Sequence, residues 1–235
     1  PSSTPWSTSY RGLMHALVTP DDHADVLSIV ATLCYGRNNC VDMIELCGGM
    51  GGISQLAFSR GLSSGGNLDK TTNIDLGDPT TQRALDHYLN TCYVRVAIIQ
   101  PSRRTTGPPS YFNAQVNYNT WKAHHKEDLP HIMFCGWVAM KQDDLGRWYL
   151  REQPTGTWVD EIHPWKELAQ RGHIVSMGID QCATGLRDDF GDYIKKPTDI
   201  TSNDEAILRP FATFRCNGRH VHAQPCNKQL TQAQH

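Results

Sequence analysis

The segment VDMIELCGGMGG, residues 41–52, constrains the fold more than any other part of the chain. Its first half is a short, nearly continuous apolar run with β-branched residues, which is typical of a buried parallel strand. Glycines follow, and residues 53–62, ISQLAFSRGL, have helical spacing that ends at Gly61. A strand, a glycine-rich turn and a helix are the first half of a βαβ unit, so the segment predicts an α/β domain.

The same alternation of strand and helix patterns continues along the chain. We expect strands over 93–100, 147–154 and 173–182, one or two short strands within 67–78, and helices over 21–35, 79–90, 131–142 and 163–172. This order favours a Rossmann-like fold, a mostly parallel central sheet flanked by helices. We predict an extended arm over residues 1–20, the domain over 21–223 and a flexible polar tail over 224–235. Because the first residue is Pro1, we interpret the chain as a processed product or a part of something longer.

Charge and cysteine content narrow the function classes. The formal net charge is −2, which excludes a global basic field, so any contact with nucleic acid would have to be local. No apolar stretch approaches the roughly 18 residues that a membrane span needs. The eight cysteines are scattered rather than packed into a short frame. We interpret them as reduced thiols of an intracellular protein.

The glycine turn is a candidate ligand site, because open α/β sheets bind ligands beyond the carboxyl ends of their strands. Its spacing is not G-x-G-x-x-G, and no basic residue follows as in a phosphate-binding loop. A nucleoside ligand with little phosphate therefore suits the turn better than a nucleoside diphosphate. A tight turn without any ligand is the alternative.

IELCGGMGG resembles the cofactor loop of class I S-adenosylmethionine-dependent methyltransferases, and within them that of the DNA cytosine-C5 group. From about Trp6 to Ala223 the chain is also similar to the methyltransferase-like domains of retrotransposon-type polyproteins from dinoflagellates and related protists. The stretches that carry this second similarity are PWSTSYRGLMHALV, EQPTGTW, DQCATGL, KKPT and CNGRHVHA. The resemblance implies S-adenosylmethionine as cofactor, with an acid at the next strand end, Asp69 or Asp75, on its ribose or adenine. The residues it places beside the methionine and ribose are Glu45, Cys47, Gly48, Gly49, Gly51 and Gly52.

The loop QPSRRT, residues 100–105, departs from that family's pattern. In the cytosine-C5 group this loop reads Pro-Cys, and the thiolate adds to the base, whereas here Arg103 stands where the cysteine is expected. An arginine stays protonated and cannot act as that nucleophile. Ser102 is a weak substitute because no histidine is positioned by sequence as its base. The loop also lacks the second proline and the aromatic residue of the amino-methyltransferases.

Two further features of this half of the chain have alternative interpretations. Glu152, in Glu152-Gln153-Pro154, is the counterpart of the family's Glu-Asn loop, where it would protonate or orient a base, or it is simply a charged strand end. The guanidinium groups of Arg103 and Arg104 could contact phosphate, because their paired N–H donors match the spacing of phosphate oxygens. They are equally well explained as solvated loop charges or as contacts with a partner.

CNGRHVHAQPC, residues 216–226, is a candidate zinc site. Cys216, His220 and His222 can supply three ligands, and the fourth would be Cys226 or a distant thiol such as Cys182. A polar tail in which these residues pack or cap is the alternative. We interpret His124 and His125 as loop residues.

Two main hypotheses follow. In the first, the domain is a catalytically silent methyltransferase fold that serves as a structural or binding subunit among other protein subunits. In the second, it is an active S-adenosylmethionine-dependent methyltransferase acting on nucleic acid. A weaker third is a retroelement polyprotein fragment whose substrate is unrelated to cytosine. The arginine at position 103 favours the first.

Overall fold

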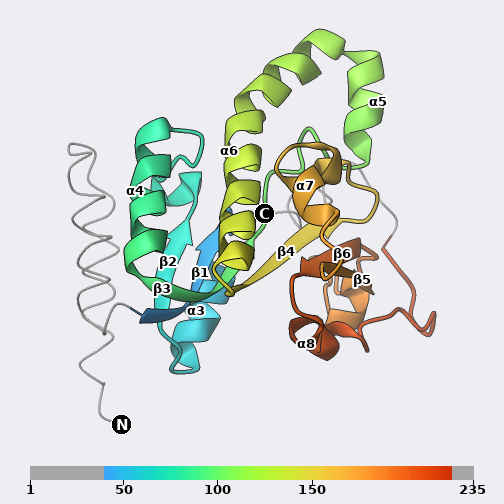
Figure 1. The fold of residues 1–235 in the computed structure, drawn as a ribbon. Helices are drawn as coiled ribbons and strands as arrows, with labels where there is room; N and C mark the ends of the chain where they lie inside the picture. The colour runs from blue at the N-terminus through green and yellow to red at the C-terminus, as the bar shows by residue number, and fades with distance from the viewer. Residues whose placement is uncertain (1–39, 224–235) are drawn as a thin grey trace. The chain divides into compact units, whose positions relative to one another are not determined.

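The computed structural model describes residues 40–223, and Figure 1 shows their arrangement. The predicted arm over 1–20, the helix over 21–35 and the tail over 224–235 lie outside these residues. Six strands are ordered β2-β1-β3-β4-β6-β5 in one sheet. The chain divides between Arg95 and Val96, within β3, into two compact units.

The first unit contains the glycine turn. Its elements are β1 (Cys40–Leu46), α3 (Gly52–Ser59), β2 (Ser64–Leu68), the 3₁₀ helix η1 (Lys70–Thr72), α4 (Pro79–Thr91) and the start of β3 (Tyr93–Ile99). The apolar side chains of β1 are buried, as expected of a strand covered on both faces, and β1 pairs with β2 in parallel. Asp78 caps α4 by accepting the N–H of Thr81 at 2.8 Å, and Pro79 occupies its first turn.

Strand β2 was only partly predicted. It begins at Ser64 and ends at Leu68, so a strand ending in an acid is confirmed at Asp69. Asp75 instead lies in the loop after η1, and its placement at a strand end is wrong. The strand was not predicted over its full length because the two glycines of SGGNL are typical of a turn. Gly65 is instead required by close packing against α4. A Cβ at Gly65 would lie 2.5 Å from the Tyr88 hydroxyl of α4.

The second unit contains the other strands and most helices. Its elements are α5 (Pro109–Val116), α6 (Tyr118–Asp144), β4 (Trp148–Pro154), η2 (Val159–Glu161), α7 (Trp165–Ala169), β5 (Val175–Asp180), η3 (Gln181–Thr184), β6 (Pro197–Ser202), α8 (Glu205–Leu208) and η4 (Arg209–Phe211). Strands β3 and β4 are parallel, and β6 is antiparallel to both β4 and β5. Only β6 is therefore reversed in this unit, and the predicted α/β class with a mostly parallel sheet is confirmed.

Helix α6 is much longer than the predicted 131–142. It begins after Asn117, whose side chain accepts the N–H of Thr120, and it continues through Pro130. The interpretation of His124 and His125 as loop residues is therefore wrong, because both lie in its first half. In the second half, Gly136 allows a close approach to α7, since a Cβ there would lie 2.9 Å from Trp165 Nε1. The Trp165 indole donates to the carbonyl of Ile132 at 2.9 Å.

Candidate functional site

The turn between β1 and α3 has an unusual backbone. Cys47, Gly49 and Gly51 all have positive φ, of 57°, 56° and 68°. Glycine adopts this left-handed conformation readily, whereas a cysteine there is strained and must be held by its surroundings. The Cys47 N–H donates to the carbonyl of Leu68 at 3.0 Å, which fixes the start of the turn to the end of β2. Strain of this kind concentrates at ligand sites.

Glu45 supports the turn from the buried side, through contacts with the start of α3. Its side chain is 1% exposed, and one carboxylate oxygen accepts both the backbone N–H of Ser54 at 2.8 Å and its hydroxyl at 2.7 Å. A Cβ at Gly48 would lie 2.2 Å from the Glu45 carboxylate. Glycine at position 48 is thus required for the carboxylate to reach the first turn of α3. The geometry gives Glu45 a supporting role in the turn.

The end of β2 braces the turn from the side. Asn67 accepts the N–H of Gly48 at 3.2 Å and donates to the carbonyl of Gly49 at 2.7 Å. Asp69 accepts the N–H of Gly49 at 3.0 Å through one oxygen and the N–H of Thr71 at 2.7 Å through the other. A carboxylate offers about four acceptor sites, so Asp69 has capacity for further donors.

The two acids predicted for the cofactor differ in their positions. Asp69 touches the glycine turn, 20 residues after the Gly49 whose N–H it accepts, as expected of an acid that binds ribose hydroxyls in dinucleotide folds. Asp75 is exposed, pairs with Lys70 at 3.5 Å and accepts the N–H of Gly77. Its contacts therefore stabilise the loop around η1 and do not reach the glycine turn. The structure brings Asp69 and the turn together and leaves Asp75 apart.

The edge of the turn at Gly49 and Gly52 is open within the described residues of the first unit. A Cβ added at Gly49 or Gly52 would meet no atom within 4 Å, and Met50 is 77% exposed. The backbone of Gly49 and Gly52 is therefore accessible at this edge, together with the side chain of Met50, beside a carboxylate with free acceptor capacity. Such a surface suits the hydroxyls of a nucleoside, and the residues present fit an adenosyl group.

The loop after β3 has a different construction. Arg104 donates to Asp128 of α6 through Nε at 3.0 Å and Nη2 at 2.6 Å, and to Glu127 at 2.9 Å. Asp128 is 4% exposed and also accepts from the hydroxyls of Ser102 and Thr105, at 3.4 and 3.3 Å. The hydrogen bonds that Arg104 donates to Asp128 raise the pKa of Arg104 further, so the guanidinium is permanently charged.

Ser102 has no histidine as a base in the described structure. Its hydroxyl contacts Asp128, whose carboxylate is already neutralised by Arg104, and accepts the backbone N–H of Arg104 at 3.3 Å. His125 Nδ1 lies 3.4 Å from the hydroxyl of Thr105 instead. This arrangement lacks the nucleophile and base pair that covalent catalysis requires.

Glu152 lies within β4 and contacts two polar side chains. It accepts from Gln181 at 3.1 Å and lies 3.6 Å from Lys196 Nζ. The pKa of Lys196 is lowered, mainly by burial, and Arg103 acts in the same direction while Glu152 opposes it. Arg103 therefore belongs to a small, mostly basic cluster, which is a local feature of the kind that nucleic acid would need.

The predicted zinc ligands converge in the second unit. One ligand atom from each of Cys182, Cys216, His220 and His222 lies within 4.8 Å of every other. Cys182 follows β5, and the other three come from the loop after η4. Cys226, the other predicted fourth ligand, lies outside the described residues. Burial raises the pKa of the Cys182 thiol, and Cys216 acts in the same direction.

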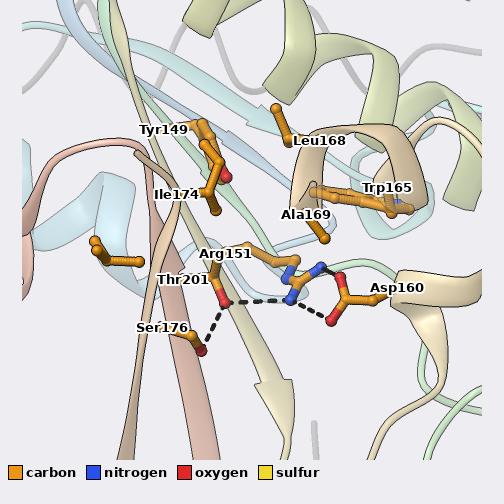
Figure 2. A pocket seen from close by; sticks show the side chains of 10 residues that line it. Tyr149, Arg151, Asp160, Trp165, Leu168, Ala169, Ile174, Ser176 and Thr201 are labelled. Atoms are coloured by element: carbon orange, nitrogen blue, oxygen red, sulfur yellow. Dashed lines mark hydrogen bonds and ion pairs between the residues drawn. The ribbon is translucent and has the colours of Figure 1, made fainter. Parts of the chain in front are cut away.

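A small cavity also lies in the second unit, and Figure 2 shows the side chains that line it. Its volume is about 140 Å³, below the roughly 300 Å³ at which ligand pockets begin, so it does not suit an adenosyl group. Arg151, 4% exposed, is paired with Asp160 and donates to Thr201 at 3.2 Å. Its guanidinium lies 5.0 Å from the ring centre of Trp165. This ion pair, between a buried arginine and a partly exposed aspartate, ties β4 to η2.

Sequence reasoning missed two residues that build these sites. Asn67 braces the glycine turn, and the only signal for it was its place two residues before Asp69 on the same strand face. Asp128 organises the arginine loop from the middle of α6, where no pattern in the sequence distinguishes it.

Comparisons with known proteins give a likeness of fold to solved structures. No protein-family model and no curated protein matches the sequence. Among solved structures, the Dnmt2 methyltransferase of S. pombe is similar, with a TM-score of 0.42 and 10% identity. The alignment covers 69% of this chain and 49% of that one, so the chain spans about half the length of the Dnmt2 structure. Within the described residues no helix is both long and apolar enough to cross a membrane.

Proposed function

We propose that the chain is a catalytically silent methyltransferase-like domain that binds S-adenosylmethionine, or its demethylated product, at the glycine turn. The binding half of the proposal is supported by the open backbone edge of the turn and by Asp69 beside it. Ribose hydroxyls would donate to Asp69, and the backbone from Cys47 to Gly52 would lie along the ligand.

The observation that carries the silent half is the loop after β3. Where the resembling family has a thiol, this loop has Arg103, followed by Arg104, which two carboxylates hold. Neither guanidinium can add to a base, and Ser102 has no proton acceptor that is free of a cation. The cytosine-C5 reaction therefore has no nucleophile in this loop.

A silent fold is left with a binding or structural role, because function depends on sites rather than on the fold that holds them. The resemblance to polyprotein-embedded domains supports a place beside other protein segments in a larger assembly. The cluster of Arg103 and Lys196 supports the alternative, an active enzyme on nucleic acid. Methyl-transfer measurements decide between the two.

The binding half is tested by isothermal titration of S-adenosylmethionine and S-adenosylhomocysteine. We expect Asp69→Ala to weaken binding by roughly 10–100-fold, because hydrogen bonds to a charged group contribute about 1.5–3 kcal/mol. Asp75→Ala is the matched control, since it removes an acid of the same segment that lies apart from the turn, and should change affinity less than about twofold. Thermal unfolding of each variant checks that the turn is intact.

The silent half is tested by transfer of a radioactive methyl group from S-adenosylmethionine to DNA and RNA. We expect no incorporation above that of heat-denatured protein. Incorporation by the wild-type chain that Glu152→Gln abolishes would overturn the silent interpretation and favour the active enzyme. Absence of any titration signal would instead leave only the structural role.

A further inference from the structure

We infer that Cys182, Cys216, His220 and His222 bind one zinc ion that fastens the loop after η4 to the end of β5. These side chains include the two ligand types that zinc prefers, thiolate sulfur and imidazole nitrogen. The inference rests on the second unit alone and holds whether or not the first unit binds an adenosyl ligand.

The spacing of the ligand atoms matches a tetrahedral zinc site. Zn–S bonds of about 2.3 Å and Zn–N bonds of about 2.0–2.1 Å place sulfur and nitrogen about 3.6 Å apart in a tetrahedron. Cys216 Sγ lies 3.7 Å from His220 Nε2 and 3.4 Å from His222 Nε2. Both Nε2 atoms therefore lie beside the same sulfur, and the two rings meet edge to face with an interplanar angle of 78°.

Hydrogen bonding alone explains this arrangement poorly. A thiol is a weak donor and its sulfur a weak acceptor, so Cys216 offers only weak hydrogen bonds to the two imidazoles that face it. The thiol of Cys182 adds a second sulfur to the same group, and it is 2% exposed. One divalent cation satisfies all four groups at once, with both thiols deprotonated.

The surroundings hold the ligands in place, as expected of a metal site. Asp180 accepts the backbone N–H of Cys216 at 3.0 Å. Tyr193 packs on the ring of His220, with centroids 4.1 Å apart, and forms a β-bridge with His222. The guanidinium of Arg187 lies 3.7 Å from the ring centre of Tyr193. These contacts orient both histidines before any metal binds.

The ligand count assigns the site a structural role. Four protein ligands fill a tetrahedral zinc site, whereas catalytic sites keep one position open for water or substrate. Cys182 completes the set, so Cys226 is not required. The zinc would link the strand edge at Asp180 to a loop that otherwise has little regular structure, and most of its stabilisation would appear in that loop.

The first test is metal content and metal spectrum of the wild-type chain. We expect mass spectrometry to find one zinc per chain after purification without chelator. Replacement of zinc by cobalt(II) should give the visible bands of tetrahedral cobalt with sulfur-to-metal charge transfer. A chain that holds less than about a tenth of one zinc after refolding with zinc, or an octahedral cobalt spectrum, would overturn the inference.

The second test assigns the fourth ligand. We expect Cys182→Ser to lower zinc affinity by more than the roughly 10–100-fold that second-shell changes cost, while Cys226→Ser keeps one zinc per chain. Loss of zinc in Cys226→Ser with retention in Cys182→Ser would contradict the assignment. Should Cys182→Ser fail to fold, the sulfur-to-cobalt charge-transfer band of Cys226→Ser provides the same comparison, because it keeps the wild-type intensity if Cys182 is the second thiolate.

Discussion

The glycine turn after β1 and the arginine loop after β3 follow buried strands but are held in opposite ways. The turn is braced by side chains from outside itself, Asn67 and Asp69, and its backbone is accessible at Gly49 and Gly52. The arginine loop uses its own side chains, with Ser102, Arg104 and Thr105 all donating to Asp128. The first loop leaves backbone accessible beside an acceptor, whereas polar side chains of the second loop are hydrogen-bonded within the fold.

The proposal of binding without chemistry rests on this difference between the two loops. A loop with an open edge can accept a ligand without breaking any of its own hydrogen bonds. A loop whose donors share one buried carboxylate must lose several bonds before it can serve a substrate. The comparison is therefore testable by measuring how much stability or ligand affinity is lost when a single side chain of each loop is substituted.

The largest effect is expected in the glycine turn. Gly48→Ala forces a Cβ to within 2.2 Å of the Glu45 carboxylate and should cost about 3 kcal/mol, at the top of the range for overpacked sites. Adenosyl binding should be lost with it, because the contact between Glu45 and Ser54 would break. Urea unfolding and titration of S-adenosylhomocysteine measure the two effects.

Gly52→Ala is the matched control for Gly48→Ala. It adds the same methyl group at the first residue of α3, where no atom lies within 4 Å. Alanine exceeds glycine in helix propensity, so we expect a change between zero and about 1 kcal/mol in favour of the folded state. Equal losses in both variants would contradict the supporting role given to Glu45.

The next effect is expected in the arginine loop. Asp128→Asn removes the buried charge that Arg104 and two hydroxyls share and should cost about 2–3 kcal/mol. Glu127→Gln removes the exposed partner of the same guanidinium and should cost about 0.5 kcal/mol or less. Urea unfolding compares them, and a larger loss in the Glu127 variant would show that the loop is held at its surface.

The fold was predictable where apolar periodicity decides the structure. Strands β1, β3, β4 and β5 and helix α4 agree with their patterns because burial selects their residues. Strand β6, PTDITS, was missed because, apart from Ile200, its buried residues are polar. Ser202 donates to the carbonyl of Tyr149 at 2.7 Å and Thr201 accepts from Arg151, so hydrogen bonds replace the apolar signal.

The sites were predictable where one segment builds them. The turn from Cys47 to Gly52 is recognisable from its own glycine-rich sequence. The sequence also limited the candidates for the acid at the next strand end to two residues. The choice of Asp69 over Asp75 needed the parallel pairing of β1 with β2. The distance between Cys182 and the cluster around Cys216 could not be read from spacing, because the return of the chain to β5 creates it.

The smallest expected effect is a pH dependence of the arginine loop. The pKa of His125 is lowered by burial, while Asp128 opposes this; its ring stacks on Trp121 with centroids 5.0 Å apart. The unfolded chain, with a histidine pKa near 6.5, therefore binds a proton before the folded one does. Stability contributed by neutral His125 is complete above about pH 6.5 and is lost as pH falls towards the lower folded pKa.

We expect His125→Gln to flatten this part of the stability profile in urea unfolding between about pH 7.5 and 5.5. An NMR titration of the imidazole gives the pKa directly. Because Asp128 favours the imidazolium, Asp128→Asn should lower the pKa of His125 further, which links the two variants through one carboxylate. A wild-type pKa of His125 near 6.5 that Asp128→Asn leaves unchanged would mean that the ring is solvated. The arginine loop would then be as open as the glycine turn, and the contrast between the two loops would fail.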